Sequence, residues 1–347
     1  MAQLRRRQSG IATIGSGANN ALATVATYVA SSSLLVYTVR GGNHEPQSSL
    51  VLALKATSGT LTFERNSLST AVLTIHWELF EFSSDVRIQN VTWTDPGSTG
   101  ISRVTLARSF IVSAGYKNGG ITQSGDDLAR FSFASATSAS HTIEAGMNVD
   151  NGMFQVVDYP GCKVQSFTLT IAANTTSWEQ TLVENVVMAR TLLFASCFYN
   201  GGNAELQFTN VFRVGLTAVD KVQGKRATMG AFTQDVTCFV AMFADWKVQR
   251  GNRTQLGGVD TSNVPIQAVT ISRSMSKTVA QHGGGHSYCE STATSDLYDE
   301  SRVTAQLTGV GPTSSNLELK RTNATPTLNI EWEVAEHVGG PDMWHHF

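Results

Sequence analysis

Paired carboxylates are the residues whose types and spacing come closest to catalysis in this chain. The densest pairs are Glu78 with Glu81 and Glu331 with Glu333. Two carboxyl groups that flank a bond can serve as acid and base, or as acid and nucleophile, as in glycoside hydrolysis. If both pairs lie in β-strands, Glu331 and Glu333 share one face, whereas Glu78 and Glu81 point to opposite faces.

Histidines are the next candidates, because imidazole binds metals and transfers protons. His282 and His286, with Cys289 close behind, could resemble a metal cluster. Their spacer is Gly-Gly-Gly, which predicts a loop and not a helix face, so we predict no metal site. His345 and His346 lie in a terminal tail, and His76 lies in a strand, where packing is its simplest role.

Other catalytic and cofactor motifs are missing or incomplete. Neither Gly15-Ser16-Gly17 nor Gly283–His286 forms the G-x-S-x-G elbow of a nucleophilic serine, and no phosphate-binding loop occurs. The acidic pairs Asp126-Asp127 and Asp299-Glu300 lack the alternating oxygen ligands of a calcium loop. We therefore predict no catalytic, cofactor-binding or metal-binding residues.

Tryptophans could form a platform for a sugar ring. Trp77 and Trp332 lie in alternating strands and are expected in a core. Trp178 and Trp246 stay candidates for an exposed carbohydrate site.

Strands must position all these side chains, because period-two alternation runs through the chain. The stretch Thr74–Phe82 (TIHWELFEF) alternates bulky and polar residues, which predicts a strand with a mostly apolar inner face. We call it the anchor strand. It recurs at Phe154–Tyr159, Phe239–Ala244 and Trp332–His337.

An acid follows the opening aromatic residue of the anchor strand at a fixed distance in three copies. The acids are Glu81, Asp158 and Glu336, and the third copy has Phe243 instead. An active site would mark one copy. A cap on neighbouring backbone therefore explains the repeated acid better.

Other motifs recur with the anchor strand at intervals of about 80 residues. A Gly-Gly pair ends an apolar strand four times, at Gly42, Gly120, Gly202 and Gly284. A strand–turn–strand pattern follows each pair, in residues 50–65, 129–145, 212–226 and 302–321. A hydrophobic-Gln dipeptide follows the first three anchor strands, at Ile88-Gln89, Val164-Gln165 and Val248-Gln249.

These repeats predict an all-β chain of four tandem units of about 80 residues, each a small antiparallel β-sandwich or barrel-like unit. The predicted units are residues 1–98 with an N-terminal tail, 99–180, 181–262, and 263–347 with a C-terminal tail. Asn19–Ser32 is rich in alanine, but its β-branched residues favour a strand over a helix.

Composition argues against several other classes. Only 15% of residues are charged and the net charge is −2, so no basic surface for nucleic acid is expected, and Arg5–Arg7 is interpreted as a solvated tail. We find no signal peptide and no membrane span. The four cysteines form no CxxC pair and are predicted to be buried thiols: Cys162, Cys197, Cys238 and Cys289.

The anchor strand and its Gln dipeptide resemble β-repeat proteins of tailed bacteriophage particles. The resemblance spans most of residues 20–337, and the fourth unit departs from it by lacking the dipeptide. It implies a virion role such as capsid decoration, tail fibre or tail adaptor. The residues that carry it are Trp77–Phe82 with Ile88-Gln89, Phe154–Tyr159 with Val164-Gln165, and Phe239–Ala244 with Val248-Gln249-Arg250-Gly251.

Three hypotheses for function stay open. The first is a non-enzymatic structural protein of a bacteriophage virion, assembled in the host cytoplasm, which forms homo-oligomers and contacts other capsid or tail proteins. It predicts no nucleic acid, membrane span or cofactor. The second is a receptor- or carbohydrate-binding tail-fibre adhesin that uses exposed Trp178 and Trp246. The third is a depolymerase of host-surface glycans that uses Glu78, Glu331 or Glu333.

Overall fold

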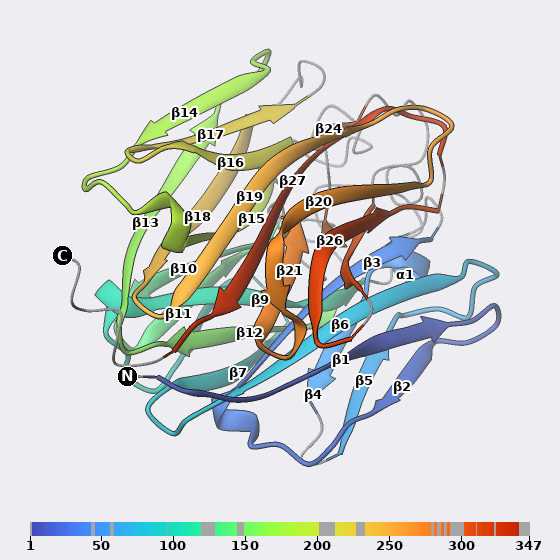
Figure 1. The fold of residues 1–347 in the computed structure, drawn as a ribbon, viewed down its shortest axis with the longest axis horizontal. Coiled ribbons are helices and arrows are strands. Elements are labelled where there is room, and N and C mark those ends of the chain that lie inside the picture. The colour runs from blue at the N-terminus through green and yellow to red at the C-terminus, as the bar shows by residue number, and fades with distance from the viewer. Residues whose placement is uncertain are drawn as a thin grey trace.

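Antiparallel β-strands make up nearly all of the chain in a computed structural model (Figure 1), which confirms the predicted all-β class. The structure describes residues 2–42, 46–55, 59–94, 96–118, 129–143, 149–200, 212–226, 233–278, 281–282, 286–287, 290–291, 302–309, 311–322 and 324–339. Strand pairing sorts most strands into four modules of six.

Modules 1 and 2 form the N-terminal half. Module 1 contains β1 (Leu4–Ile14), β2 (Asn20–Thr24), β3 (Ser33–Gly41), β4 (Leu52–Lys55), β5 (Thr60–Glu64) and β6 (Leu73–Phe82), with the 3₁₀ turn η1 (Ala30–Ser32) and the short helix α1 (Pro46–Ser49). Module 2 contains β7 (Arg87–Trp93), β8 (Gly97–Gly100), η2 (Leu106–Arg108), β9 (Ser109–Asn118), β10 (Arg130–Ser135), β11 (Ser138–Thr142) and β12 (Val149–Asp158).

Modules 3 and 4 follow the same order. Module 3 contains β13 (Cys162–Ile171), β14 (Ser177–Thr181), η4 (Met188–Arg190), β15 (Thr191–Asn200), β16 (Phe212–Ala218), β17 (Lys221–Arg226) and β18 (Thr233–Phe243). Module 4 contains β19 (Trp246–Gln255), β20 (Thr261–Thr270), η6 (Ile271–Arg273), β21 (Ser274–Thr278), β25 (Thr304–Thr308), β26 (Thr313–Lys320) and β27 (Leu328–His337), with the short strands β22 (Gln281–His282), β23 (His286–Ser287) and β24 (Glu290–Ser291).

Each module has two three-stranded sheets. The first, last and third strands form one sheet, as in β1-β6-β3, and the second, fifth and fourth strands form the other, as in β2-β5-β4. Modules 1 and 2 are also joined by pairing between β4 and β9 at Leu52 and Gly115. Each module is therefore built as a small antiparallel sandwich, as the repeats predicted.

The strand pairing sets a repeat frame that begins earlier than the sequence motifs suggested. Each hydrophobic-Gln dipeptide lies in the first strand of the next module and not at the end of the preceding one. For example, β7 carries Ile88-Gln89 and pairs with β12, the last strand of module 2. The sheet-defined modules span residues 4–82, 87–158, 162–243 and 246–337. Division into folding domains at 98/99, 180/181 and 262/263 stays a prediction.

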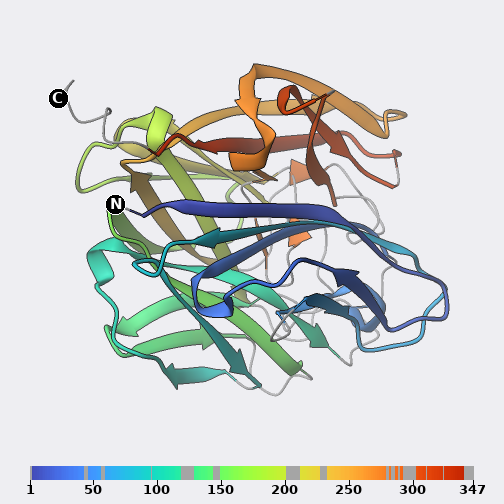
Figure 2. The same ribbon diagram turned by 60° about the horizontal axis from the view of Figure 1, so that its bottom comes forward.

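The four modules close into a ring (Figures 1 and 2). Each 3₁₀ turn lies against the first strand of the next module, in the contacts η1–β7, η2–β13, η4–β19 and η6–β1. Each fourth strand likewise contacts the last strand of the next module, in the pairs β4–β12, β10–β18, β16–β27 and β25–β6. Because module 4 meets module 1 through the same contacts, the ring is closed and the modules do not form an open stack.

The last strands are buried on both faces, unlike a strand with one solvent-facing side. In β6, Ile75, Trp77 and Leu79 pack inside the sandwich of module 1. On the opposite face, Phe80 and Phe82 join a larger core that residues of all four modules share. The predicted inner face is therefore real, but the other face is buried between modules.

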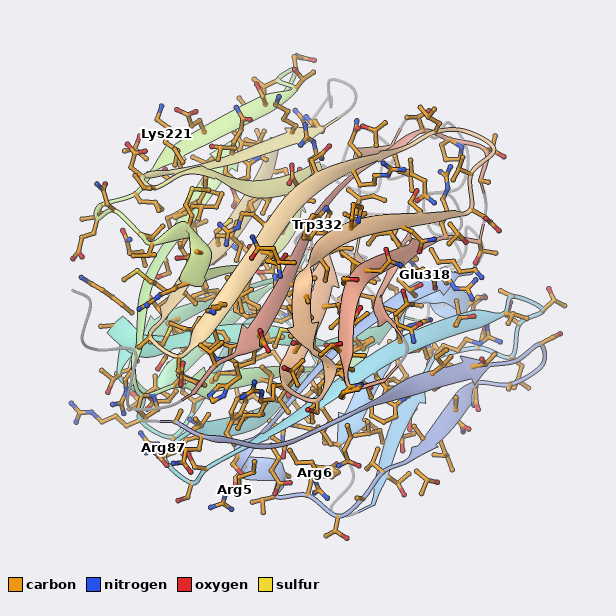
Figure 3. The ribbon with its side chains drawn as sticks, viewed as in Figure 1. Arg5, Arg6, Arg87, Lys221, Glu318 and Trp332 are labelled. Carbon is orange, nitrogen blue, oxygen red and sulfur yellow. The ribbon has the colours of Figure 1, made fainter. Side chains whose placement is uncertain are left out.

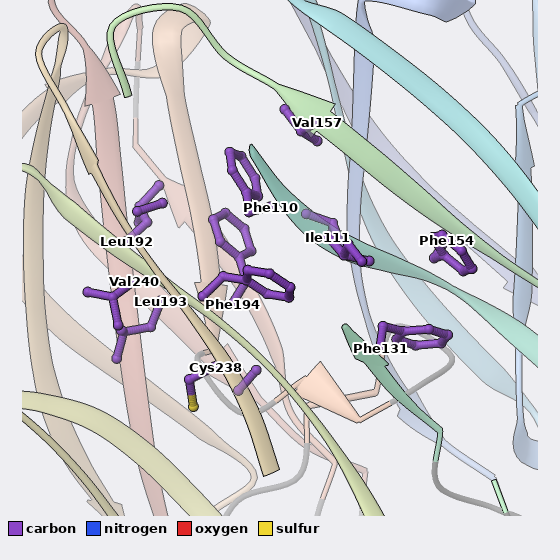
Figure 4. Close-up of a cluster of buried hydrophobic side chains, with 14 of the residues drawn as sticks. Phe110, Ile111, Phe131, Phe154, Val157, Leu192, Leu193, Phe194, Cys238 and Val240 are labelled. Atoms are coloured by element: carbon purple, nitrogen blue, oxygen red, sulfur yellow. The ribbon is translucent and has the colours of Figure 1, made fainter. Parts of the chain in front are cut away.

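Side chains from all four modules meet at the ring centre. Phe82 contacts Tyr159 edge-on, with ring centroids 5.5 Å apart, and Tyr159 contacts Phe243 in the same way at 5.1 Å. Phe110 stacks on Phe194 at 4.6 Å between β9 and β15 (Figure 4). Modules of this size bury small cores on their own, so the shared centre adds burial that only the ring provides.

The first Gly-Gly pair occupies backbone that other residues rarely adopt. Gly41 and Gly42 have positive φ angles of 83° and 123°. A Cβ on Gly41 would lie 2.3 Å from the carbonyl oxygen of Val72. This explains the pair ending β3; the pairs at Gly120, Gly202 and Gly284 lie outside the described residues.

Candidate functional site

The carboxylates of β6 are held by neighbouring donors. The Glu78 carboxylate accepts hydrogen bonds from Arg7 at 2.7 Å and from the backbone N–H and hydroxyl of Ser276 at 3.0 Å. Glu81 lies on the opposite face, as predicted, and pairs with Arg6 at 2.7 Å. Ser276 belongs to module 4, so Glu78 ties the last module to the first.

Glu331 and Glu333 lie on the same side of β27, as predicted, and both are bound. Glu331 pairs with Arg213 of module 3. Burial raises the pKa of Glu331, and Arg213 opposes that shift. Glu333 is buried, with its carboxylate 2.9 Å from the Lys277 ammonium and 3.4 Å from the Arg250 guanidinium. These contacts give both acids a structural use.

Side chains at one position of the last strand cap the free edge of the third strand of the preceding module. Gln155 accepts from the Leu35 N–H at 2.9 Å and donates to the Leu35 carbonyl at 2.7 Å. Glu333 accepts from the Leu193 N–H at 3.2 Å, and Glu78 binds Ser276 as above. The corresponding residue in module 3 is Phe239. An unpaired strand edge is thereby closed inside the ring.

Two of the three repeated acids cap neighbouring backbone, as the sequence predicted. The Val29 N–H donates to Glu81 at 3.3 Å, and the Thr270 N–H donates to Glu336 at 2.9 Å. Asp158 instead accepts from Arg108 at 2.6 Å and from Arg87 at 2.7 Å. All three carboxylates hold the entry to the third strand of their modules.

In module 3 the residue at the position of these acids is Met242. The sequence comparison assigned Phe243 to this position, which was wrong by one residue. Met242 pairs with Thr191 at the start of β15, as Glu81 pairs with Ser33 at the start of β3. The Val187 N–H lies 3.2 Å from the Met242 sulfur. A sulfur acceptor thus replaces the carboxylate in module 3.

A glutamine clamp occurs in every module. Gln89 donates to the Ser102 carbonyl at 2.8 Å and accepts from the Ser102 N–H at 2.6 Å. The same two bonds join Gln8 to Ala26, Gln165 to Glu184 and Gln249 to Gln267. Gln249 therefore belongs to module 4, and Gln8 completes the set. No dipeptide follows the fourth anchor strand, as the sequence shows, because the glutamine lies in the first strand of each module and module 4 already carries Gln249 in β19.

Buried arginines fasten the loops at the other end of three modules. The Arg65 guanidinium donates to the backbone carbonyls of Ala18 at 2.7 Å and of Ala71 at 2.7 Å. Arg226 and Arg321 bond loop carbonyls in the same way, while module 2 has Ile143 at this position. Carbonyl oxygens disperse the charge of a buried guanidinium, so these arginines act as staples.

The two tryptophans that the adhesin hypothesis needs at the surface are buried. Trp178 is 9% exposed and Trp246 is 2% exposed, so neither forms a surface platform for a sugar. Trp246 instead contacts Phe82 and Phe243 at the ring centre. Trp178 lies over Gly224, where a Cβ would come within 2.1 Å of its ring. The sequence around each tryptophan did not indicate these partners, because they lie far away along the chain.

Each module pairs a tryptophan with a glycine across two strands. The register places Trp77 opposite Gly10, Trp93 opposite Gly152, Trp178 opposite Gly224 and Trp332 opposite Gly251. A ring that covers a strand glycine replaces the packing that the glycine lacks. A single glycine inside a strand pattern was the sequence signal that could have predicted these tryptophan–glycine pairs.

A buried polar group at the ring centre escaped the sequence interpretation. The Tyr159 hydroxyl donates to Asp245 at 2.8 Å and accepts from the Trp246 indole N–H at 3.1 Å. His337 Nε2 lies 3.4 Å from the same Asp245 carboxylate. Asp245 lies between two modules in a turn, a position that no motif marked. Because all four side chains are buried, this group joins modules and faces no open cleft.

The remaining histidine and cysteine candidates have ordinary roles where the structure describes them. His76 is packed in β6, as expected, and Cys162, Cys197 and Cys238 are free buried thiols, as predicted. Burial raises the pKa of all three thiols. The backbone pairs His282 with His286 in a short hairpin. Among the described residues no histidine, cysteine or acid cluster could hold a metal. Outside them lie Cys289, Asp126-Asp127, Asp299-Glu300, His345 and His346.

An open groove lies where module 3 meets module 4. Its volume is about 340 Å³, and Arg190 and Lys247 line it together with Ala189, Val248, Ala268 and Glu336. Gln249 and Gln267 also line the groove, so its walls combine two basic side chains, one carboxylate, two amides and aliphatic groups. This groove is the hollow that we consider as a candidate binding site.

Comparisons with known proteins identify no family. No family model and no curated protein matches the chain. A solved structure described as a triple jelly roll and turret assembly of an archaeal virus aligns over 97% of this chain and 90% of its own, at 9% identity and a TM-score of 0.14. Sulfolobus turreted icosahedral virus aligns over 98% and 91%, at 10% identity and 0.14, and particles derived from infectious bursal virus over 99% and 81%, at 8% and 0.13. Such low TM-scores carry no argument about this chain.

No helix in the described part of the chain is long and apolar enough to cross a membrane.

Proposed function

We propose that this chain is a non-enzymatic structural protein of a virus particle that acts through protein–protein contacts. The motif resemblance to β-repeat proteins of tailed phages makes capsid decoration or a tail accessory role the specific form of the proposal. The proposal also includes that the chain forms a homo-oligomer and assembles with other virion proteins in the host cytoplasm.

The closed ring is the observation that carries this proposal. The carboxylates with catalytic spacing are engaged in structural contacts. Glu78 and Glu333 each pair with a cation of their own module, Arg7 and Lys277, and each bonds the preceding module, at Ser276 and Leu193. Catalytic acids instead need a partner and a space for substrate between them. A rigid ring tied by its own polar groups suits a part that occupies space and contacts neighbours.

Particle composition tests the proposal. Particles purified from an infected culture should contain the chain at a fixed ratio to the major capsid protein, measured by quantitative mass spectrometry. Its absence from washed particles, with the chain free in the lysate, contradicts the proposal.

Enzymatic activity provides the opposing test. The purified chain should release no sugar from host-surface polysaccharide. Turnover by the wild-type chain that Glu331→Gln abolishes would instead favour the depolymerase hypothesis, provided that the variant melts at the wild-type temperature.

A further inference from the structure

We propose that one end of the ring is a docking face for an acidic segment of a partner protein. We call it the turn face; it consists of the four 3₁₀ turns, the first residues of the first strands and the last residues of the last strands. The inference rests on the proposed function as a contact protein and adds the chemistry of the contact.

Strand register places equivalent residues of all four modules on this face. Arg6 lies opposite Glu81, and Glu81 lies opposite Ser33, at the start of β3 beside η1. The same register puts Arg87 opposite Asp158, Lys163 opposite Met242 and Lys247 opposite Glu336. A basic residue therefore occupies the same position of every module, and the ring repeats it four times around its centre.

A second set of cations lies beside the first. Three of the four turns end in arginine, at Arg108, Arg190 and Arg273. Figure 3 shows Arg5, Arg6 and Arg87 together along one margin of the molecule. The face thus carries two basic positions per module, except in module 1, where Ser32 ends the turn.

The acids of this face lie beneath its cations. The side chains of Arg87, Lys163 and Arg273 are 56%, 55% and 48% exposed. Those of Glu81, Asp158 and Glu336 are 12%, 1% and 14% exposed. Among the described residues of the face, the exposed acids are Asp85 and Glu184, and Glu184 is bound by Lys163. An approaching partner therefore meets mainly positive charge, although the whole chain carries −2.

Aliphatic side chains separate the cations. Val29, Leu106 and Val187, at the starts of three turns, are 49%, 45% and 43% exposed. The groove lined by Arg190 and Lys247 opens on the same face, and its one acid, Glu336, is turned to the Thr270 N–H. Alternating basic and aliphatic groups match a segment in which acidic and aliphatic residues alternate.

Other polyanions fit this face less well. Single-stranded nucleic acid binders stack bases on exposed aromatic rings. The exposed apolar residues on the described part of this face are aliphatic, and Trp246 beneath it is buried. We therefore assign the face to an acidic polypeptide.

A charge reversal in the groove, paired with a matched control, tests the inference. The probe is a fluorescein-labelled peptide of repeating Glu-Leu-Glu-Ala sequence, with a Gln-Leu-Gln-Ala peptide as its neutral counterpart. Binding is followed by fluorescence anisotropy with the full chain. We expect the acidic peptide alone to bind, and its affinity to fall as salt is raised.

Lys247→Glu should weaken this binding about three- to tenfold, because it removes one attraction and adds one repulsion. Arg253→Glu makes the same charge change on the same strand, at a position that pairs with Ile330 away from the turn face, and should leave affinity within about twofold. Both residues are exposed, so equal melting temperatures are expected and should be checked.

Equal binding of both peptides, equal effects of the two variants, or tighter binding of an oligothymidine than of the acidic peptide would each overturn the inference. The proposed function is judged separately. A chain that is present in particles but ignores the peptide contradicts only the docking face, and a chain that binds the peptide but is absent from particles contradicts only the virion role.

Discussion

The outer glutamine clamp is identical in all four modules, whereas the residue at the inner edge varies among them. Gln8, Gln89, Gln165 and Gln249 make the same two backbone hydrogen bonds. At the inner position the residues are Glu78, Gln155, Phe239 and Glu333. The clamp serves a connection within one module, so one solution fits every copy. The inner cap faces a different neighbour at each junction.

Two junctions show how far the inner solutions diverge. At the junction of modules 3 and 4, Glu333 and Lys277 of module 4 form a buried ion pair, and both bond the backbone of Leu193 in module 3. Between modules 2 and 3, Phe239 at the same position packs edge-on against Phe133 at 5.7 Å. The same backbone arrangement accommodates either a buried ion pair or aromatic packing, provided that the side chains on both sides of the junction are of matching polarity.

The buried ion pair should give the largest effect. Glu333→Gln removes the carboxylate and leaves Lys277 charged and buried, which should lower the free energy of unfolding by about 3–5 kcal/mol. Urea denaturation of the full chain measures it. The double variant Glu333→Leu with Lys277→Met should recover part of this loss, because the buried ammonium is removed, while Arg250 and the Leu193 backbone still lose a partner. A single variant as stable as wild type would show that the pair is not buried as described.

Removal of the inner amide cap at Gln155 should give the second largest loss of stability. Gln155→Ala leaves the N–H and the carbonyl of Leu35 without their partner inside the ring, where Gln155 is fully buried. Each unsatisfied buried group costs about 1–3 kcal/mol, so a loss of about 2–4 kcal/mol is expected in the same denaturation experiment.

The outer clamp supplies the matched control. Gln249→Ala removes the same two kinds of bond, but near the surface, where water can replace the amide. The expected loss is about 1 kcal/mol. Equal losses for Gln155→Ala and Gln249→Ala would mean that burial does not separate the two regions, and the comparison would fail.

The same contrast explains what sequence could predict. Strands, sandwich modules and the fourfold repeat came from alternation and spacing, because every copy needs them locally. The backbone cap was predicted correctly for Glu81 and Glu336 for the same reason, whereas the recurring Asp158 binds two arginines instead. Ring closure left no local signal, since it depends on contacts such as η6 with β1 from opposite ends of the chain.

The errors of sequence interpretation concentrate on the inner side. Alignment on Phe239 failed because that aromatic residue occupies the position of Glu78, and the true equivalent of Trp77 is Cys238. Trp178 and Trp246 stayed candidates for an exposed sugar site because their partners, Gly224 and Tyr159, lie far away in sequence. The Tyr159–Asp245–His337 group was missed because its members lie far apart in sequence: Tyr159 links modules 2 and 3, Asp245 links modules 3 and 4, and His337 ends module 4.

The inner region should also respond to pH, whereas the glutamine clamp cannot. Burial, with Arg40 and Lys320 nearby, lowers the pKa of His76 to about 4. An unfolded chain binds that proton near pH 6.5, so the stability due to neutral His76 is complete above this pH and is lost as the pH falls toward 4. Wild type should lose about 1 kcal/mol between pH 7.5 and pH 6 that His76→Gln does not lose. Urea denaturation of both chains at the two pH values measures the difference. Parallel losses would place the pH sensitivity in groups other than His76, and the link between inner packing and acid response would not hold.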